Sequence, residues 1–231
     1  MELLHETHQL HFFSKNSDIE PTAPFINAFK NELQAFNLVP VSGNELNLSG
    51  SVGQQRQYLI LMTPDNKLRI EFPTSEVVVI VEGGTLEEFR DISSTVLSAL
   101  EKLFPMKMAN RLSILNSKYF RSNVDSYSRL YHKLFTYKDA EPFEWDNRIV
   151  ERKELPESKE LINSISTIRR CEVKTPFIDG GRQQDIIAME IDSNTLHQHS
   201  SMRFSIPEAR RVFSELYDNN DSLTSALVRY F

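Results

Sequence analysis

The chain has few of the residues that build phosphate-binding loops and disulfide frameworks. Its 231 residues include seven glycines and a single cysteine, Cys171. One cysteine excludes an internal disulfide, and the sequence contains neither a Walker A loop nor a Gly-x-Gly-x-x-Gly turn. Because a protein without disulfides suits a reducing compartment, we predict a cytoplasmic protein. Because the nucleotide-binding loops are missing, we predict that it uses no cofactor.

Long hydrophobic runs are missing as well. The longest uninterrupted apolar stretch covers residues 77–81, far short of the roughly 20 residues that cross a bilayer. The N-terminal stretch, MELLHETHQLHFF, has no basic region followed by an apolar one, so it does not predict a signal peptide. With 40% hydrophobic and 25% charged residues, the composition is that of a folded globular protein, and we expect no membrane partner.

Residues 57–104 carry the clearest structural pattern, in which a series of strands leads into a long helix. Apolar and β-branched residues separated by turn chemistry predict strands at 57–63, 67–72 and 76–82. Thr85 and Glu88 then match a capping box, in which the hydroxyl and the carboxylate satisfy free N–H groups at a helix start. The helix that begins there is expected to end before Pro105.

The rest of the chain gives weaker patterns, which we interpret by the same periodicities. Strand-like patterns occur at 2–13, 111–120, 171–178, 185–192 and 202–206. Helical spacing predicts helices after Thr22, at 126–135, at 156–168, after a second capping box at Ser205 and Glu208, and after Asp221. Polar composition predicts irregular structure at 40–56 and 138–154.

Together these elements predict an α+β fold with two lobes, each an antiparallel sheet covered by helices. We place the N-terminal lobe at residues 1–106 and the C-terminal lobe at residues 107–231. Each lobe runs from a strand through a helix and further strands to a long capped helix. This shared outline suggests a structural duplication.

Five segments occur in an order that resembles a known arrangement. They are residues 67–72, the predicted helix 85–103, the stretch NRLSILN at 110–116, the tripeptide Glu190-Ile191-Asp192, and the predicted helix 205–217. In this order the chain resembles a sporadically distributed, uncharacterised bacterial protein family. That family has a fuller arginine–tyrosine–isoleucine–asparagine strand, for which Arg111 and Asn116 are the best candidates here. The resemblance implies an α+β fold and no catalytic residue.

Charge is unevenly distributed along the chain. Residues 102–138 hold eight basic side chains and one acidic one, whereas the net charge of the whole chain is −6. Aromatic residues are interleaved with these cations, which suits single-stranded nucleic acid, an acidic protein or an acidic surface on a second copy. Alternatively, the aromatic rings belong to the core, and the cations pair with the acidic flanks of their own chain or form a solvated face. The candidate binding residues are Lys107, Arg111, Lys118, Arg121, Arg129 and Lys133.

A second candidate site lies in the stretch EIDSNTLHQH. Asp192, which leaves a predicted strand, is followed by His197 and His199, and these are residue types that bind metal ions. Glu190 is a further carboxylate on the same strand face. The alternative is a polar loop with exposed histidines.

Two other chemically notable features have simpler interpretations. The stretch HETHQLH does not match the His-Glu-x-x-His pattern of zinc proteases. We expect an edge strand on which His5, His8 and His11 face solvent. Cys171 begins an apolar strand and is expected to be a buried structural cysteine, because nothing nearby would lower its pKa.

These patterns lead us to expect a non-enzymatic accessory protein of bacterial or phage origin, with a defence, immunity or antitoxin-like role. It would bind another protein or a second copy of itself, as a homodimer, through the basic segment. The first alternative is a nucleic-acid-binding component of a larger complex. The second is a metal-dependent hydrolase or nuclease that uses Glu190, Asp192, His197 and His199.

Overall fold

The fold is given by a computed structural model, which describes residues 1–49, 52–197, 200–227 and 230. The strands are β1 (Glu2–Ser14), β2 (Val39–Ser49), β3 (Val52–Met62), β4 (Leu68–Glu71), β5 (Val77–Glu82), β6 (Met108–Arg121), β7 (Trp145–Glu154), β8 (Leu161–Val173), β9 (Gln184–Thr195) and β10 (Phe204–Ser205). The α-helices are α1 (Ala23–Glu32), α2 (Leu86–Leu103), α3 (Val124–Leu134) and α4 (Ile206–Leu227). Two short 3-10 helices are η1 (Gln34–Phe36) and η2 (Asp179–Gly181).

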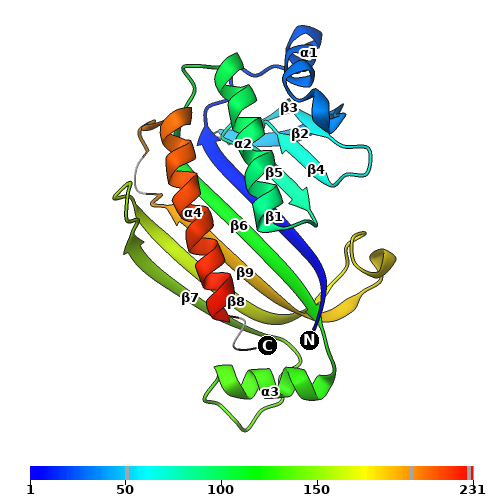
Figure 1. The fold of residues 1–231 in the computed structure, drawn as a ribbon. Helices are drawn as coiled ribbons and strands as arrows, with labels where there is room; N and C mark the ends of the chain where they lie inside the picture. Colours follow the sequence, from blue (N-terminus) through cyan, green and yellow to red (C-terminus); the bar gives the residue numbers. More distant parts are fainter. Residues whose placement is uncertain (50–51, 198–199, 228–229, 231) are drawn as a thin grey trace.

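In the described part of the chain, ten strands form one antiparallel sheet. Its order is β2-β3-β4-β5-β1-β6-β9-β8-β7, and β10 pairs with the start of β6. The two long central strands, β1 and β6, pair from Glu2 opposite Arg121 to Ser14 opposite Ala109. Figure 1 shows the twisted sheet running behind the helices, with β7 at one edge.

The four α-helices of the described residues all pack on one face of the sheet. Helix α2 contacts β1 and β5, α4 contacts β6 and β9, and α1 packs against α2 (Figure 1). Helix α3 packs its Tyr127 and Leu130 into a smaller apolar cluster with Ile168 of β8 and Met189 of β9. In the described residues the opposite face carries no α-helix, and no described helix is long and apolar enough to span a membrane.

The pattern predicted for residues 57–104 is confirmed, and so is the α+β class. The Oγ1 atom of Thr85 accepts a hydrogen bond from the Glu88 N–H (3.2 Å), and the Glu88 carboxylate accepts one from the Thr85 N–H (2.7 Å). The second capping box, Ser205 with Glu208, is formed as well. These caps fix where α2 and α4 begin and therefore which strands they cover.

Five predictions for other segments were wrong. One is the separate strand at 171–178, because Cys171 belongs to β8, which begins at Leu161 and ends at Val173. Residues 40–56 are not a loop, because β2 and β3 pair along this stretch. Residues 138–154 include the strand β7, and residues 156–168 include the first half of β8 instead of a helix. Asp221 does not cap a separate helix, since α4 continues from Ile206 to Leu227.

The segment assigned to β8 shows why a spacing of three to four residues misleads. Leu161, Ile165 and Ile168 fit one face of a helix, but the residues between them alternate with period two. Ile162 and Ser164 are buried under α4, with Ile168 near α3, and the intervening side chains point to the other face. The β-branched content of the segment was the better indicator.

A buried polar network joins α4 to the sheet. The side-chain nitrogen of Asn220 donates to the Asn116 side-chain oxygen and to the Ile114 carbonyl (3.1 Å), and Ser193 Oγ donates to the Asn220 side-chain oxygen. Beside it, Asn219 donates to the hydroxyl oxygens of Ser164 and Ser193, at 2.9 and 2.6 Å. Such a network fixes the position of the helix along the strands, because any shift would leave buried polar groups unpaired.

Candidate functional site

The six predicted binding residues of the basic segment do not form one surface. Lys107 immediately precedes β6, Arg111, Lys118 and Arg121 lie along that central strand, and Arg129 and Lys133 lie on α3. In Figure 1, β6 crosses the whole sheet and α3 lies beyond one of its ends. The segment is therefore a structural core strand with a helix attached, and its cations reach separate places.

Four cations of the basic segment pair with carboxylates near the N-terminus. The ion pairs are Lys102–Glu32 (2.6 Å), Lys107–Asp18 (2.7 Å), Lys118–Glu6 (2.9 Å) and Arg121–Glu2 (3.2 Å). This is the arrangement in which the basic centre neutralises the acidic flank of its own chain. Charge that is already paired is less available to an external anion.

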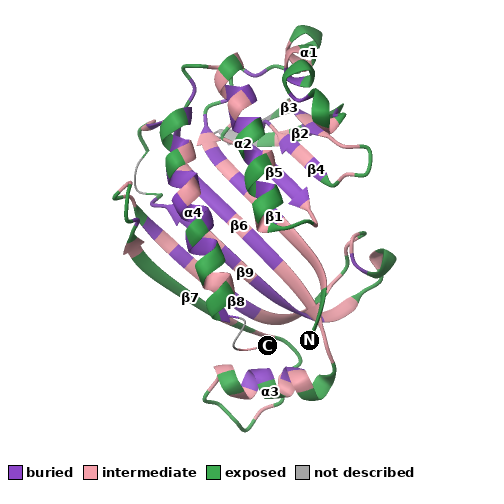
Figure 2. Cartoon of the chain, viewed as in Figure 1, coloured by how far each residue is buried: buried purple, intermediate pink, exposed green. Residues whose placement is uncertain are grey.

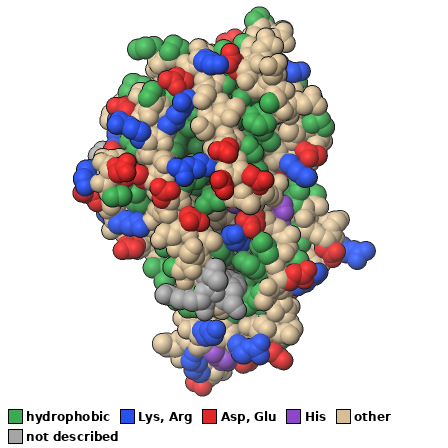
Figure 3. All heavy atoms as spheres, in the orientation of Figure 1, with side chains coloured by type: hydrophobic (Ala, Val, Ile, Leu, Met, Phe, Trp, Pro, Cys, Tyr) green, Lys and Arg blue, Asp and Glu red, His purple; other side chains and the backbone are tan. Residues whose placement is uncertain are grey.

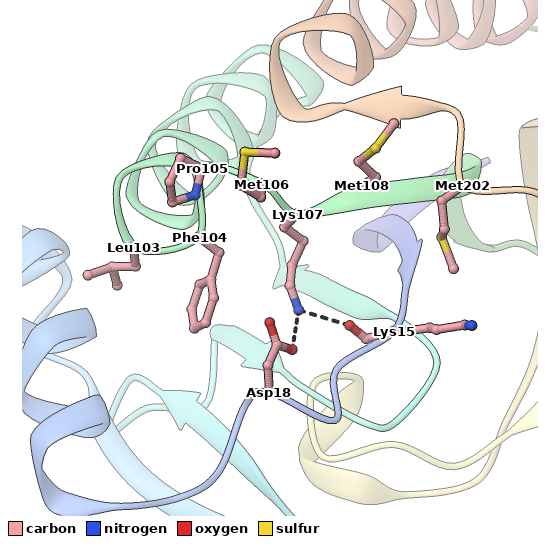
Figure 4. Close-up of a pocket in the computed structure, with 9 residues that line it drawn as sticks. All are labelled: Lys15, Asp18, Leu103, Phe104, Pro105, Met106, Lys107, Met108 and Met202. Carbon is pink, nitrogen blue, oxygen red and sulfur yellow. Dashed lines mark hydrogen bonds and ion pairs between the residues drawn. The ribbon is translucent and has the colours of Figure 1, made fainter.

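Lys107 is the most buried of these cations, with 7% of its surface exposed. Its ammonium group also donates to the Lys15 carbonyl (2.9 Å) and to Oδ1 of Asn16 (3.1 Å). Burial lowers the pKa of this ammonium group, although the contact with Asp18 opposes the shift. Figure 4 shows Lys107 pointing towards Asp18 and the Lys15 carbonyl. Lys107 lines an open cavity of about 520 Å³, to which Met106 and Met108 also contribute.

The remaining predicted residues differ from one another in their surroundings. The Arg111 guanidinium lies over the Phe13 ring, 4.9 Å from its centre, and is half-buried. Arg129 and Lys133 are exposed on α3, and within the described residues neither forms an ion pair. On the face shown in Figure 3, basic and acidic side chains are interspersed, without a large patch of one sign.

The predicted metal ligands are described only in part. Asp192 lies on β9, where its carboxylate accepts hydrogen bonds from Ser113 Oγ (2.8 Å) and from the Asn194 side chain (2.9 Å). His197 is exposed in a turn after β9, and His199 lies outside the described residues. Among the residues that are described, no three His, Cys, Asp or Glu side chains are grouped closely enough to hold a metal ion.

The prediction of an edge strand with solvent-facing histidines was wrong. The strand β1 lies at the centre of the sheet, between β5 and β6. His8 is buried on the helix-covered face, where its ring stacks on Phe89 at 5.4 Å and its Nδ1 atom accepts a hydrogen bond from Asn116 (2.8 Å). His5 and His11 point to the other face and pair with carboxylates.

Cys171 also differs in position from what the sequence predicted. It lies near the end of the long strand β8, and it is half-buried. Burial raises the pKa of its thiol, which keeps it protonated and weakly nucleophilic.

We expect the buried His8 to make the protein less stable in acid. Desolvation lowers the pKa of this imidazole, although its bond to the Gly84 carbonyl and the nearby Glu6 carboxylate oppose the shift. Below a pH of about 6.5, the unfolded chain therefore binds a proton that folded His8 does not. The free energy of unfolding consequently decreases as the pH is lowered. In His8→Gln this contribution is absent, so the difference in unfolding free energy between wild type and variant should shrink in acid. Denaturant titrations at several pH values test this, and parallel curves would contradict it.

The face without helices, which we call the open face, extends across the strands of the described sheet. It is formed by the side chains that alternate with those under the helices. On the four central strands these are Thr7, Gln9, His11, Ser113, Leu115, Ser117, Glu190, Asp192, Ile165 and Thr167. They are half-buried or buried by one another, so the open face is a closely packed layer of mixed polarity.

Charged groups at the centre of the open face are held in pairs. His5 contacts Glu82 (2.9 Å) and His11 contacts Glu76 (2.8 Å). On the neighbouring strands, Arg169 donates to Glu190 (2.8 Å). The His5 ring also stacks on Tyr119 and on Phe177, at 6.3 and 5.4 Å between ring centres. In the sequence, the signal for this face is the alternation of side chains along β1 and β6. That signal identifies a continuous face only when the neighbouring strands are known.

Comparison with known proteins adds no further assignment. No protein-family model and no curated protein matches the chain.

Proposed function

We propose that this chain is a non-enzymatic accessory protein that binds another protein through the open face. The main observation in support is that every described α-helix packs on the same face of a ten-stranded sheet, which leaves the other face without helices. An antiparallel sheet tolerates water on its other face, so solvent alone could cover it. Two further features of the open face favour a protein partner.

The first feature is that the open face is ordered before any partner arrives. Stacking fixes the His5 ring between Tyr119 and Phe177, and ion pairs fix Glu82 and Glu190. Side chains that are already immobilised lose little conformational entropy on binding. Aromatic and arginine side chains are also the types enriched at protein interfaces.

The second feature is the charge of the open face, which favours a protein over nucleic acid. Among the arginines inward of β7, Arg69 lies 3.8 Å from Glu71, Arg111 lies over Phe13, and Arg169 is paired with Glu190. Arg148 and Arg152, which form no ion pair with a described residue, lie on this face only at its β7 edge. Binding to nucleic acid requires cations that can replace the counterions of phosphates. The basic segment contributes Arg111 and Tyr119 to this face, together with Ser113, Leu115 and Ser117 between them.

We also propose that the fold arose by structural duplication. The central strands β1 and β6 each begin a series that ends in a long helix on the same face of the sheet, α2 and α4. The sheet order is mirrored about their contact, with β5 beside β1 and β9 beside β6. Lobes at 1–106 and 107–231 would then share one sheet.

A bacterial or phage origin and a cytoplasmic location remain part of this proposal. A single cysteine suits the reducing compartment that a cytoplasmic location implies.

The proposal predicts that an additional charge at the centre of the open face weakens partner binding. Leu115→Arg places an arginine at the centre of the open face, whereas Ser94→Arg places one on the exposed side of α2. Immobilised wild type, L115R and S94R are each incubated with host lysate, and retained proteins are identified by mass spectrometry. We expect a partner retained by wild type and S94R, with at least about tenfold weaker affinity for L115R, equal to about 1.4 kcal/mol.

Circular dichroism establishes that both variants are folded. A partner that L115R retains as well as wild type would contradict the assignment of the open face. Retention that nuclease treatment abolishes, with affinity falling steeply as salt rises, would instead establish the nucleic-acid alternative.

A further inference from the structure

The strand β7 is an unpaired edge of the sheet with exposed hydrophobic side chains. It pairs with β8 along ten residues, and no described strand lies on its outer side. Ile149 and Val150 are 59% and 47% exposed, on opposite faces of the strand. Figure 2 shows β7 as exposed over most of its length. A long edge of this kind is a template for pairing with another strand.

The other edge of the sheet is less suited to pairing. The strand β2 contains Pro40, which has no N–H group to donate. Within the described residues, β7 contains no proline and no glycine.

Charge distinguishes β7 further. Along the central strands several charged side chains form ion pairs, as in Lys118–Glu6 and Arg169–Glu190. On β7, five charged side chains form no ion pair and no side-chain hydrogen bond with any described residue. They are Asp146, Arg148, Glu151, Arg152 and Lys153.

We propose that β7 pairs antiparallel with β7 of a second copy, so that two sheets join into one. A twofold axis perpendicular to the sheet relates the copies, because only this axis makes two equivalent edges antiparallel. The axis keeps the open faces on the same side, so paired residue numbers must add to an even sum. Ile149 then lies opposite Ile149 of the second copy, and its exposed surface is buried.

The unpaired charges select this register over its neighbours. With Ile149 at the axis, Asp146 lies opposite Arg152 of the second copy, and symmetry repeats this pair. Trp145 lies opposite Lys153, where a cation can rest against the indole ring. No like charges face each other within β7 in this arrangement.

The registers centred on Arg148, Val150 and Glu151 are opposed by like charges, and a register centred on Asn147 would pair only residues 145–149 of β7. Centring the pair on Arg148 places that residue opposite itself, and centring it on Glu151 does the same for Glu151. Centring it on Val150 places Arg148 opposite Arg152 twice. Like charges directly opposite each other destabilise an antiparallel pair.

Dimerisation through β7 specifies a second copy as one partner, and it holds whether or not the open face binds anything. Helices of both copies lie on one side of the joined sheet. On the other side the open faces become continuous.

Charge exchange between Asp146 and Arg152 tests the pairing. Asp146→Arg and Arg152→Asp each replace two attractive pairs with two repulsive ones, so each should raise the dimer dissociation constant at least about tenfold. The double variant restores the attraction and should dimerise like wild type. An equimolar mixture of the two single variants should form a heterodimer. Analytical ultracentrifugation over a range of concentrations measures all four, and circular dichroism checks folding.

Three results would overturn the proposal. One is a wild-type protein that stays monomeric up to the highest soluble concentration. The others are single variants that dimerise as tightly as wild type, and a folded double variant that does not regain association.

Cysteine cross-linking tests the register. In a Cys171→Ser background, Ile149→Cys should form a disulfide-linked dimer under mild oxidation, because the two residues are opposite each other at about 5 Å between Cβ atoms. Val150→Cys and Glu151→Cys are matched controls that lie at the axis only in the rejected registers. Faster cross-linking by either control would overturn the register centred on Ile149.

Discussion

Replacing Asn220 with leucine should lower the free energy of unfolding by about 4 kcal/mol, despite the similar size of the two side chains. Asn220 is fully buried and bonds Asn116, Ser193 and the Ile114 carbonyl. Leucine would leave the Asn116 oxygen and the Ser193 hydroxyl without these partners, and each buried unpaired group costs about 1–3 kcal/mol. The loss would lower the melting temperature by roughly 10 °C.

The neighbouring residue provides the matched control. Asp221 is exposed on the same helix turn, so Asp221→Asn should change stability by less than about 0.5 kcal/mol. Chemical denaturation of both variants gives the comparison. If the network acts as a unit, Ser193→Ala combined with Asn220→Leu should cost less than the sum of the single changes. A loss below about 1 kcal/mol for N220L would mean that water, or a shift of α4, supplies new hydrogen-bond partners to the Asn116 oxygen and the Ser193 hydroxyl.

The same network explains one limit of sequence-based prediction. The stretch Asp218-Asn219-Asn220-Asp221 has the composition of a helix end, and the sequence predicts a new helix after it. In the structure, Asn219 and Asn220 are buried and bonded to residues of three strands, which keeps them helical. Local composition cannot reveal partners that lie between 26 and 106 residues away along the chain.

Where the signals were local, the sequence predicted the structure well. The strand at 76–82 and both capping boxes depend on residues within a few positions of each other, and all are confirmed. Neighbouring strands that are distant in sequence were not predictable in this way. The centrality of β1, and with it the burial of His8, follows from its pairing with β6.

The basic segment illustrates a similar limit for the candidate site. Its excess of positive charge is real, but the structure places Lys118 and Arg121 beside Glu6 and Glu2. Reversing Arg111, Lys118 and Arg121 to glutamate would test the basic segment as a binding surface. That triple change would also break intramolecular pairs on the central strands, so a single change at Leu115 on the open face is the cleaner test.

Lys107→Met should destabilise the protein by about 3 kcal/mol, far more than the same change at Lys102. Both lysines belong to the basic segment, and both lie within 3 Å of a carboxylate of the N-terminal region. Lys107 is buried and also bonds the Lys15 carbonyl and Asn16, which would lose a charged donor. Lys102 forms an exposed pair with Glu32, and such pairs contribute at most about 1 kcal/mol.

Urea titrations of K107M and K102M test this difference, with circular dichroism at low denaturant to confirm the fold. Equal effects of the two substitutions would show that the buried ammonium group is worth no more than a surface charge.

The pH dependence of K107M gives an independent test of the burial of Lys107. Because its pKa is lowered in the folded protein, the unfolded chain binds this proton more tightly. The contribution of Lys107 to stability therefore increases as pH rises through the folded pKa towards the unfolded value of about 10.4. The free-energy difference between wild type and K107M should widen over this range, while other titrating groups cancel between the two proteins. A difference that narrows with rising pH would mean that the ion pair with Asp18 outweighs desolvation and raises the pKa of Lys107.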